Sequence, residues 1–139
     1  MSWDIIVLNL PPGIKSIDEI PKDWRPPLLG PRSQIIAAIA ALYPQCNFGD
    51  PSWGTLQLPG CLIEFSLGTD EEVESFAMHV RGDDGAPDIV SRILSGLGMP
   101  AIDSSTGGIF QHDPALRAEG FNRWRGFRDY VTDASGDRS

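Results

Sequence analysis

The clearest pattern along the chain is a strict alternation of apolar and polar positions over residues 61–68 and 73–82. The apolar positions are Ile63, Phe65 and Leu67 in the first stretch and Phe76, Met78 and Val80 in the second. A period of two on both sides of a short acidic connection predicts an antiparallel β-hairpin. We expect these apolar side chains to share one face of the hairpin and to point into a core.

The opposite face of this hairpin collects polar side chains. When the two apolar sets are matched across the hairpin, Glu64 lies beside either Ala77 or His79. In both registers Glu64, His79 and Arg81 fall on the same face. Such a cluster can act as a general acid and base with an anion anchor. It is also what a solvated, partner-binding sheet face displays when opposite charges pair across strands.

The rest of the chain divides into strand and helix patterns. We expect a central strand over residues 3–10, helices over 31–43 and 87–97, a loop over 44–54, short strands at 55–58 and from 101, and a C-terminal helix over 115–131. This order predicts an α+β fold with two layers. We expect a mixed, mostly antiparallel sheet of about five strands, two helices on one face and a C-terminal helix.

Composition changes after residue 110. Residues 1–110 are expected to form a single α+β domain, and residues 111–139 a C-terminal helical extension rich in arginine and aromatic residues, with a frayed end. Trp124, Phe127, Arg125 and Arg128 are the residues of this helix expected to contact a partner or a second copy. Folding back onto the domain is the simplest alternative, so a homodimer through the helix is one of several open outcomes.

The charge of −8 lies in the body of the protein. Residues 1–110 hold 14 acidic and 6 basic residues, whereas residues 111–139 hold 5 of each. Such a surface repels phosphate backbones and anionic lipids, so we expect neither nucleic acid nor membrane as a partner. A basic protein or a cationic ligand is favoured.

The sequence holds no complete catalytic or metal-binding motif. Cys46 and Cys61 lie in no metal or redox spacing, and the histidines His79 and His112 belong to separate elements. We therefore expect reduced cysteines, no metal and no cofactor. The first ten residues show neither a basic leader nor an apolar run of membrane-spanning length, which predicts a cytoplasmic protein.

Several short motifs resemble a group of small bacterial proteins that has no assigned activity. They are Trp3-Asp4, Pro26-Pro-Leu-Leu-Gly-Pro-Arg32, Asp50-Pro-Ser-Trp-Gly54, Ile63-Glu-Phe-Ser-Leu-Gly68, His79-Val-Arg-Gly82 and Ala101-Ile-Asp-Ser-Ser-Thr-Gly107. The resemblance covers about residues 1–110 and implies a single α+β domain. In size, acidity and order of elements, the chain also resembles, more loosely, the immunity proteins that neutralise bacterial polymorphic toxins.

Two functions from different classes follow. The first is a non-enzymatic protein-binding module with an acidic surface, most concretely an immunity-type inhibitor of a bacterial toxin. The second is a small-molecule-binding protein or hydrolytic enzyme that uses Glu64, His79 and Arg81, with Trp53 and Trp24 as walls of the site.

Overall fold

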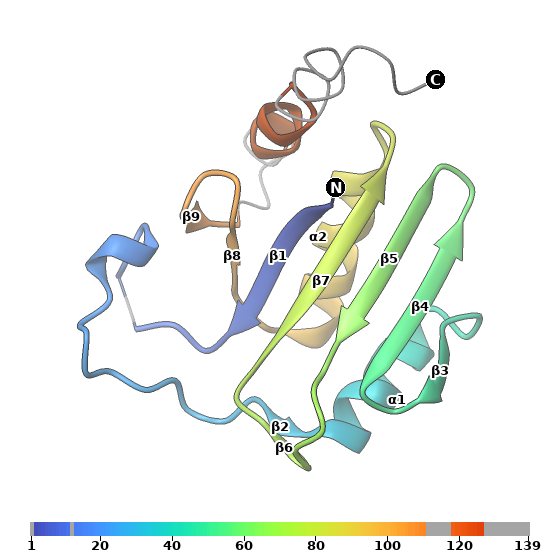
Figure 1. Ribbon diagram of the computed structural model, residues 1–139, viewed down its shortest axis with the longest axis horizontal. Helices are drawn as coiled ribbons and strands as arrows, with labels where there is room; N and C mark the ends of the chain where they lie inside the picture. The colour runs from blue at the N-terminus through green and yellow to red at the C-terminus, as the bar shows by residue number, and fades with distance from the viewer. Residues whose placement is uncertain (1, 12, 111–117, 127–139) are drawn as a thin grey trace, which may run out of the picture.

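The computed structural model describes residues 2–11, 13–110 and 118–126. Its main element is a seven-stranded sheet with the strand order β3-β4-β5-β7-β1-β8-β9 (Figure 1). These strands are β1 (Trp3–Leu8), β3 (Asn47–Asp50), β4 (Trp53–Leu58), β5 (Cys61–Ser66), β7 (Ser75–Gly82), β8 (Ala101–Asp103) and β9 (Gly108–Ile109). A separate pair is formed by β2 (Gly30–Pro31) and β6 (Glu72–Val73). The helices are α1 (Arg32–Leu42), α2 (Ala86–Leu97), the short 3-10 helix η1 (Ile17–Glu19) and residues 118–126.

The predicted α+β class is confirmed, but the described sheet differs from the one expected. It has seven strands instead of about five, and every pairing between described strands is antiparallel, so the expected mixed character is absent from them. The expected loop at 44–54 instead contains β3 and the start of β4. The reason is a tight turn in which the Ser52 amide and hydroxyl donate to Asp50 Oδ1, at 2.9 and 2.7 Å, and return the chain as a strand.

The hairpin and the central strand are where the sequence places them. β5 pairs with β7 in the register that sets Glu64 opposite His79, one of the two predicted registers. β1 lies between β7 and β8 and pairs with both. A strand with neighbours on both sides has its backbone groups satisfied, which suits the apolar side chains on both faces of β1.

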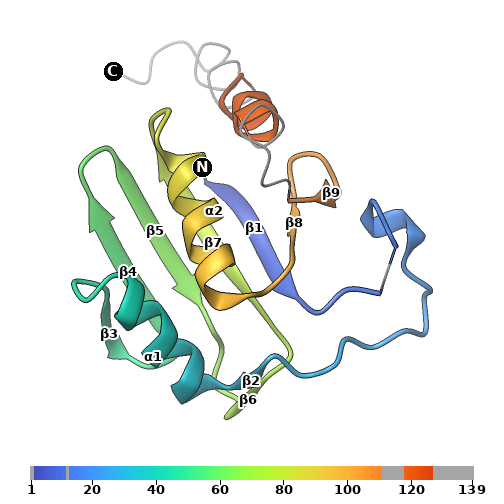
Figure 2. The ribbon, with the colours of Figure 1, turned by 180° about the vertical axis from the view of Figure 1, so that it is seen from behind.

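Both long helices cover one face of the sheet, as comparison of Figures 1 and 2 shows. The fully buried side chains between the layers include Ile5 from β1, Ile63 and Phe65 from β5, Met78 from β7, Ile39 from α1 and Ile93 from α2. Burying one such side chain stabilises the fold by roughly 1.5–3 kcal/mol. Among the described residues, no helix has the length and apolar content needed to cross a membrane.

The helix over residues 118–126 closes one end of this core. Phe121 and Trp124 are buried there, and the Phe121 ring meets the Trp3 ring edge-on, with centroids 5.2 Å apart. The Trp3 indole N–H donates to Asp103 Oδ1 at 2.9 Å, so the buried carboxylate has a donor partner. The hydrophobic core therefore continues past residue 110 into the C-terminal segment.

Candidate functional site on the open face of the sheet

The face of the sheet that no helix covers carries a row of polar side chains. Strand pairing sets Thr55 of β4, Glu64 of β5, His79 of β7 and Asp4 of β1 side by side in that order. The row forms because successive side chains of a strand point to opposite faces of the sheet. The apolar side chains face the helices, and the four polar side chains face the open side. Figure 1 views the sheet with both helices behind it, and no described element lies in front of these strands.

An ion pair and a histidine–carboxylate hydrogen bond occupy the centre of this face. The Arg81 guanidinium donates to Glu64 Oε1, and His79 Nδ1 lies 2.9 Å from Asp4 Oδ1. An ionised carboxylate only accepts hydrogen bonds, so in this contact Nδ1 carries the proton. The Ser2 hydroxyl also donates to Asp4 Oδ1. Each carboxylate of the row is thus matched by a cationic or proton-donating partner within the cluster.

An exposed tryptophan lies beside these two interactions. The Trp53 ring stacks on the His79 ring with centroids 5.8 Å apart and planes 21° apart, and 40% of the Trp53 surface remains exposed. Trp53 belongs to β4 and His79 to β7, so the indole must lie across β5. The intervening row holds Ser66 and Ala77, whose small side chains leave room for it.

The open face also carries apolar surface. Ile6 and Leu8 of β1, Leu62 of β5 and Ala77 of β7 point to this side and are all partly exposed. Ile6 pairs with Ala77 and lies beside Leu8, whereas Leu62 lies beyond the polar row. Partly exposed apolar side chains near an exposed aromatic ring are typical of a contact surface. We refer to Asp4, Trp53, Glu64, His79 and Arg81, with these apolar neighbours, as the open-face cluster.

The structure brings together four of the five residues predicted to bind. Glu64, His79, Arg81 and Trp53 share the open face, whereas Trp24 does not join them. Trp24 lies in the segment that runs from η1 to β2, and in the described structure it makes no ring contact or side-chain hydrogen bond with the cluster. Its neighbour Arg25 pairs with Glu74, which directly precedes β7, so this segment lies at the start of that strand.

The proposed partner helix faces its own domain. Trp124 is 5% exposed and packs against Phe121, so its ring is not presented to a partner. Arg125 lies over the Phe121 ring at 5.1 Å and pairs with Asp84, which ties it to the body of the protein. The physical reason is the open end of the core at Trp3, which the helix covers. Phe127 and Arg128 lie outside the described residues.

Sequence reasoning missed Asp4. The residue was recognised only as part of the Trp3-Asp4 motif, because its contact with His79 depends on β1 being the neighbour of β7. The available signal was the alternation within β1, which sends Asp4 away from its buried neighbours Trp3 and Ile5.

The chemistry that this face offers is binding by paired charges and an aromatic ring. The described residues contain no group of three or more His, Cys, Asp or Glu side chains that could hold a metal ion. Burial raises the pKa of both free thiols, Cys46 and Cys61, to about 11, so neither is a thiolate nucleophile near neutral pH. The described cavities of about 630, 290 and 180 Å³ are lined by residues outside the open-face cluster.

Comparison of the chain with protein-family models, with curated proteins and with solved structures found no match. The case for function therefore rests on the geometry of the chain itself.

Proposed function

We propose that this protein is a non-enzymatic protein-binding module that docks a basic partner on its open sheet face, most concretely as an immunity-type inhibitor of a bacterial toxin in the cytoplasm. The observation that carries the proposal is the exposed Trp53 ring, stacked on His79 next to the His79–Asp4 hydrogen bond and the Arg81–Glu64 ion pair. Tryptophan and arginine are the residues most enriched at the energetic centres of protein interfaces.

The paired charges favour binding to a protein over catalysis. Arg81 already pairs with Glu64, so it is not a free anchor for an anionic substrate. The cluster also lies on an open sheet, whereas enzyme sites usually exclude water from a concave pocket. A face whose charges are internally neutralised loses less solvation when a partner covers it than isolated charges would.

The acidic loops at both ends of β7 supply the preference for a basic partner. Exposed Asp70 and Glu71 precede this strand, and exposed Asp83 and Asp84 follow it. A polar rim around an aromatic centre is the usual anatomy of a protein interface. With a net charge of −8, this rim attracts basic surfaces at long range and accelerates their association. The same charge disfavours nucleic acids and anionic membranes.

The proposal is tested by comparing partner capture by matched variants. Immobilised wild-type protein, Trp53→Ala and Leu28→Ala would be exposed to extract of the source organism in low and high salt. Leu28 is the control because it is even more exposed than Trp53, at 55% against 40%, but lies outside the cluster. The partner should be basic, should be retained by wild type and Leu28→Ala, and should be lost with Trp53→Ala and with high salt. Trp53→Ala should then bind the purified partner with a Kd at least about tenfold higher than that of the wild-type protein.

The immunity role of the proposed module predicts a second, separate result. Expressing the identified partner alone should arrest growth, and co-expression of the wild-type protein should restore it, whereas Trp53→Ala should protect poorly. Binding that is indifferent to salt and to Trp53 contradicts the proposed surface. A harmless partner contradicts only the immunity role.

A second candidate function rests on the contact between His79 and Asp4. A carboxylate bonded to Nδ1 orients an imidazole and leaves Nε2 for a general-base role, an arrangement that hydrolytic enzymes use. This candidate predicts that the purified protein hydrolyses an activated ester and that His79→Gln and Asp4→Asn each abolish the activity. An unchanged rate in His79→Gln would exclude it.

A further inference from the structure

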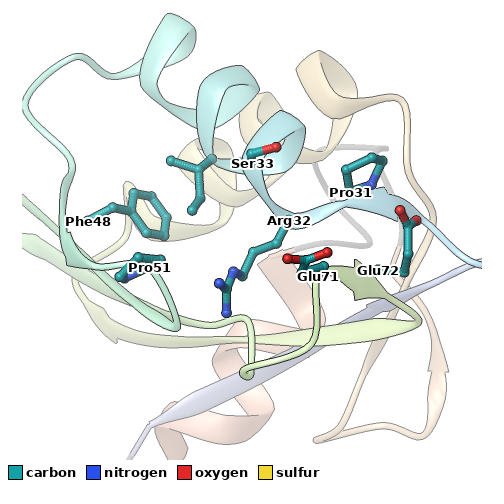
Figure 3. A pocket seen from close by; sticks show the side chains of 8 residues that line it. Pro31, Arg32, Ser33, Phe48, Pro51, Glu71 and Glu72 are labelled. Atoms are coloured by element: carbon teal, nitrogen blue, oxygen red, sulfur yellow. The ribbon is translucent and has the colours of Figure 1, made fainter.

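A separate cavity of about 630 Å³ lies away from the open-face cluster (Figure 3). It opens to solvent and is bordered by β2 and the start of α1, by β3 and the turn that follows it, and by the acidic connection with the start of β6. The lining residues are Pro31, Arg32, Ser33, Ile36, Phe48, Pro51, Glu71 and Glu72. A cavity of this size is within the range that proteins use for small ligands.

Hydrogen bonds between distant segments hold the walls of this cavity. The Arg32 amide donates to the Glu71 carbonyl at 2.7 Å, and the Arg32 guanidinium donates to the Gly68 carbonyl at 2.9 Å. On the other side, the Leu67 amide donates to the Ser52 carbonyl at 2.9 Å. The backbone of the cavity walls and the Arg32 guanidinium are therefore positioned before any ligand arrives, which lowers the entropy cost of binding.

The apolar wall is equally fixed. The Phe48 ring packs against the Phe65 ring of the core with centroids 6.0 Å apart. It also lies directly over Gly54, where an added Cβ atom would come within 2.4 Å of the ring. Phe48 thus both plugs the edge of the core and presents a ring to the cavity, beside Ile36 and Pro51.

The charges of the lining are of both signs. In Figure 3 the Arg32 side chain extends between Pro51 on one side and Glu71 on the other, and Glu72 lies beyond Glu71. Asp50 lies in the turn beside the cavity, where the hydrogen bonds from Ser52 lower its pKa and the charge of Arg32 lowers it slightly further. Among the described residues, the Arg32 guanidinium makes one hydrogen bond, to the Gly68 carbonyl, so further N–H donors of Arg32 can bind a ligand.

We propose that this cavity binds a small zwitterion, a free amino acid or dipeptide with an apolar side chain. The ligand carboxylate accepts hydrogen bonds from Arg32, the ammonium group pairs with Glu71 and Glu72, and the side chain packs on Phe48 and Ile36. A simple anion would meet the repulsion of Glu71 and Glu72, and a simple cation would leave the Arg32 donors unpaired. The inference does not use the open-face cluster, although Glu71 also belongs to the acidic loop before β7.

The experiment is a titration followed by NMR spectra of the ¹⁵N-labelled protein. The probes are phenylalanine and the dipeptide Phe-Phe, with phenethylamine and 3-phenylpropionate as ligands that each lack one charge. We expect a zwitterion to shift the amide signals of residues 32–36, 48–50 and 68–72, and to bind at least about tenfold more tightly than either singly charged ligand. Whichever of phenylalanine and Phe-Phe binds more tightly indicates whether the ligand is a single amino acid or a dipeptide.

Variants separate the roles of the lining residues. Arg32→Gln and the double variant Glu71→Gln/Glu72→Gln should each weaken the binding of the zwitterion about tenfold or more, whereas Arg25→Gln, outside the cavity, should not change it. Ser33→Trp fills the cavity without removing a charged group and should also block binding, which keeps the test valid if Arg32→Gln unfolds. Equal affinity for phenethylamine and phenylalanine, or no shift with any probe at millimolar concentration, would overturn the proposal.

Discussion

The two faces of the same sheet differ in the burial of their side chains and in the role that these side chains have. On the covered face, Ile63, Phe65 and Met78 are fully buried between the sheet and the helices, so their contribution is to stability. On the open face, Glu64 and His79 occupy alternate positions of the same strands and remain partly exposed, Glu64 in an ion pair with Arg81 and His79 in a hydrogen bond with Asp4. The difference indicates that covered-face substitutions should change the free energy of unfolding, whereas open-face substitutions should chiefly change binding.

The largest effect is expected for Phe65→Ala. Removing a fully buried ring leaves a cavity and should lower the free energy of unfolding by about 3–5 kcal/mol, measured by urea denaturation. Its neighbour Ser66 points to the open face, so Ser66→Ala should cost less than about 0.5 kcal/mol. Similar costs for the two variants would remove the distinction between the faces.

A somewhat smaller loss is expected for Trp3→Phe. The phenyl ring fills less of the core, and Asp103 loses the indole N–H that donates to it at 2.9 Å. Together these changes should lower stability by about 2–4 kcal/mol. Trp24→Phe, at a half-buried position, is the control and should cost less than about 1 kcal/mol in the same thermal or urea unfolding experiment.

Gly82→Ala tests how tightly the end of the central hairpin is packed. An added Cβ atom would lie 2.6 Å from the carbonyl oxygen of Gly60, a backbone atom that cannot rotate away. We expect a loss of about 1–3 kcal/mol. Gly85→Ala is the matched control, because nothing lies within 4 Å of its added Cβ atom, and it should leave stability nearly unchanged.

Among the substitutions whose stability is measured at neutral pH, those that remove a charge from the open face should change the free energy of unfolding least. Glu64→Gln breaks a partly exposed ion pair with Arg81, and Asp4→Asn weakens a partly exposed hydrogen bond with His79; such surface interactions contribute below about 1 kcal/mol. If either variant instead unfolds the protein, the cluster is a structural support and not a binding surface. Chemical denaturation at low and high salt measures the difference.

Ionisation of the buried Cys61 thiol should make the free energy of unfolding depend on pH. Burial, with a smaller contribution from the charge of Asp83, raises the pKa of Cys61 from 9.0 to about 11. The folded state thus favours the protonated thiol, so its contribution is complete below about pH 9 and is lost as pH rises through about 11. Cys61→Ala should flatten the stability curve over this range, and an unchanged slope would contradict the assignment.

The sequence predicts those parts of the fold that depend on local periodicity. The alternation around Phe65 and Met78 predicts the hairpin, and the isoleucines of α1 predict a helix against a sheet. The strand β3 was missed because Gly49, Asp50 and Pro51 are typical of loops, and only pairing with β4 gives this segment its extended form. Local propensity does not contain that information.

The candidate sites were predictable to a smaller extent. Glu64, His79 and Arg81 belong to one hairpin, so their common face follows from register alone. Asp4 and Trp53 reach His79 from strands that are distant in sequence, and the order of strands in a sheet is not encoded in any one segment. The cavity at Arg32 draws its lining from still more segments, which explains why no motif announced it.

The position of β1 has a consequence for biosynthesis. Trp3 pairs opposite Val80, and Ile5 pairs opposite Asp103, so this apolar strand leaves the ribosome well before either neighbour exists. Closing such long loops makes folding slow, and an unpaired apolar strand is prone to aggregate in the meantime. Nascent chains of this protein should therefore depend on chaperones that shield residues 3–8 until translation has passed β8.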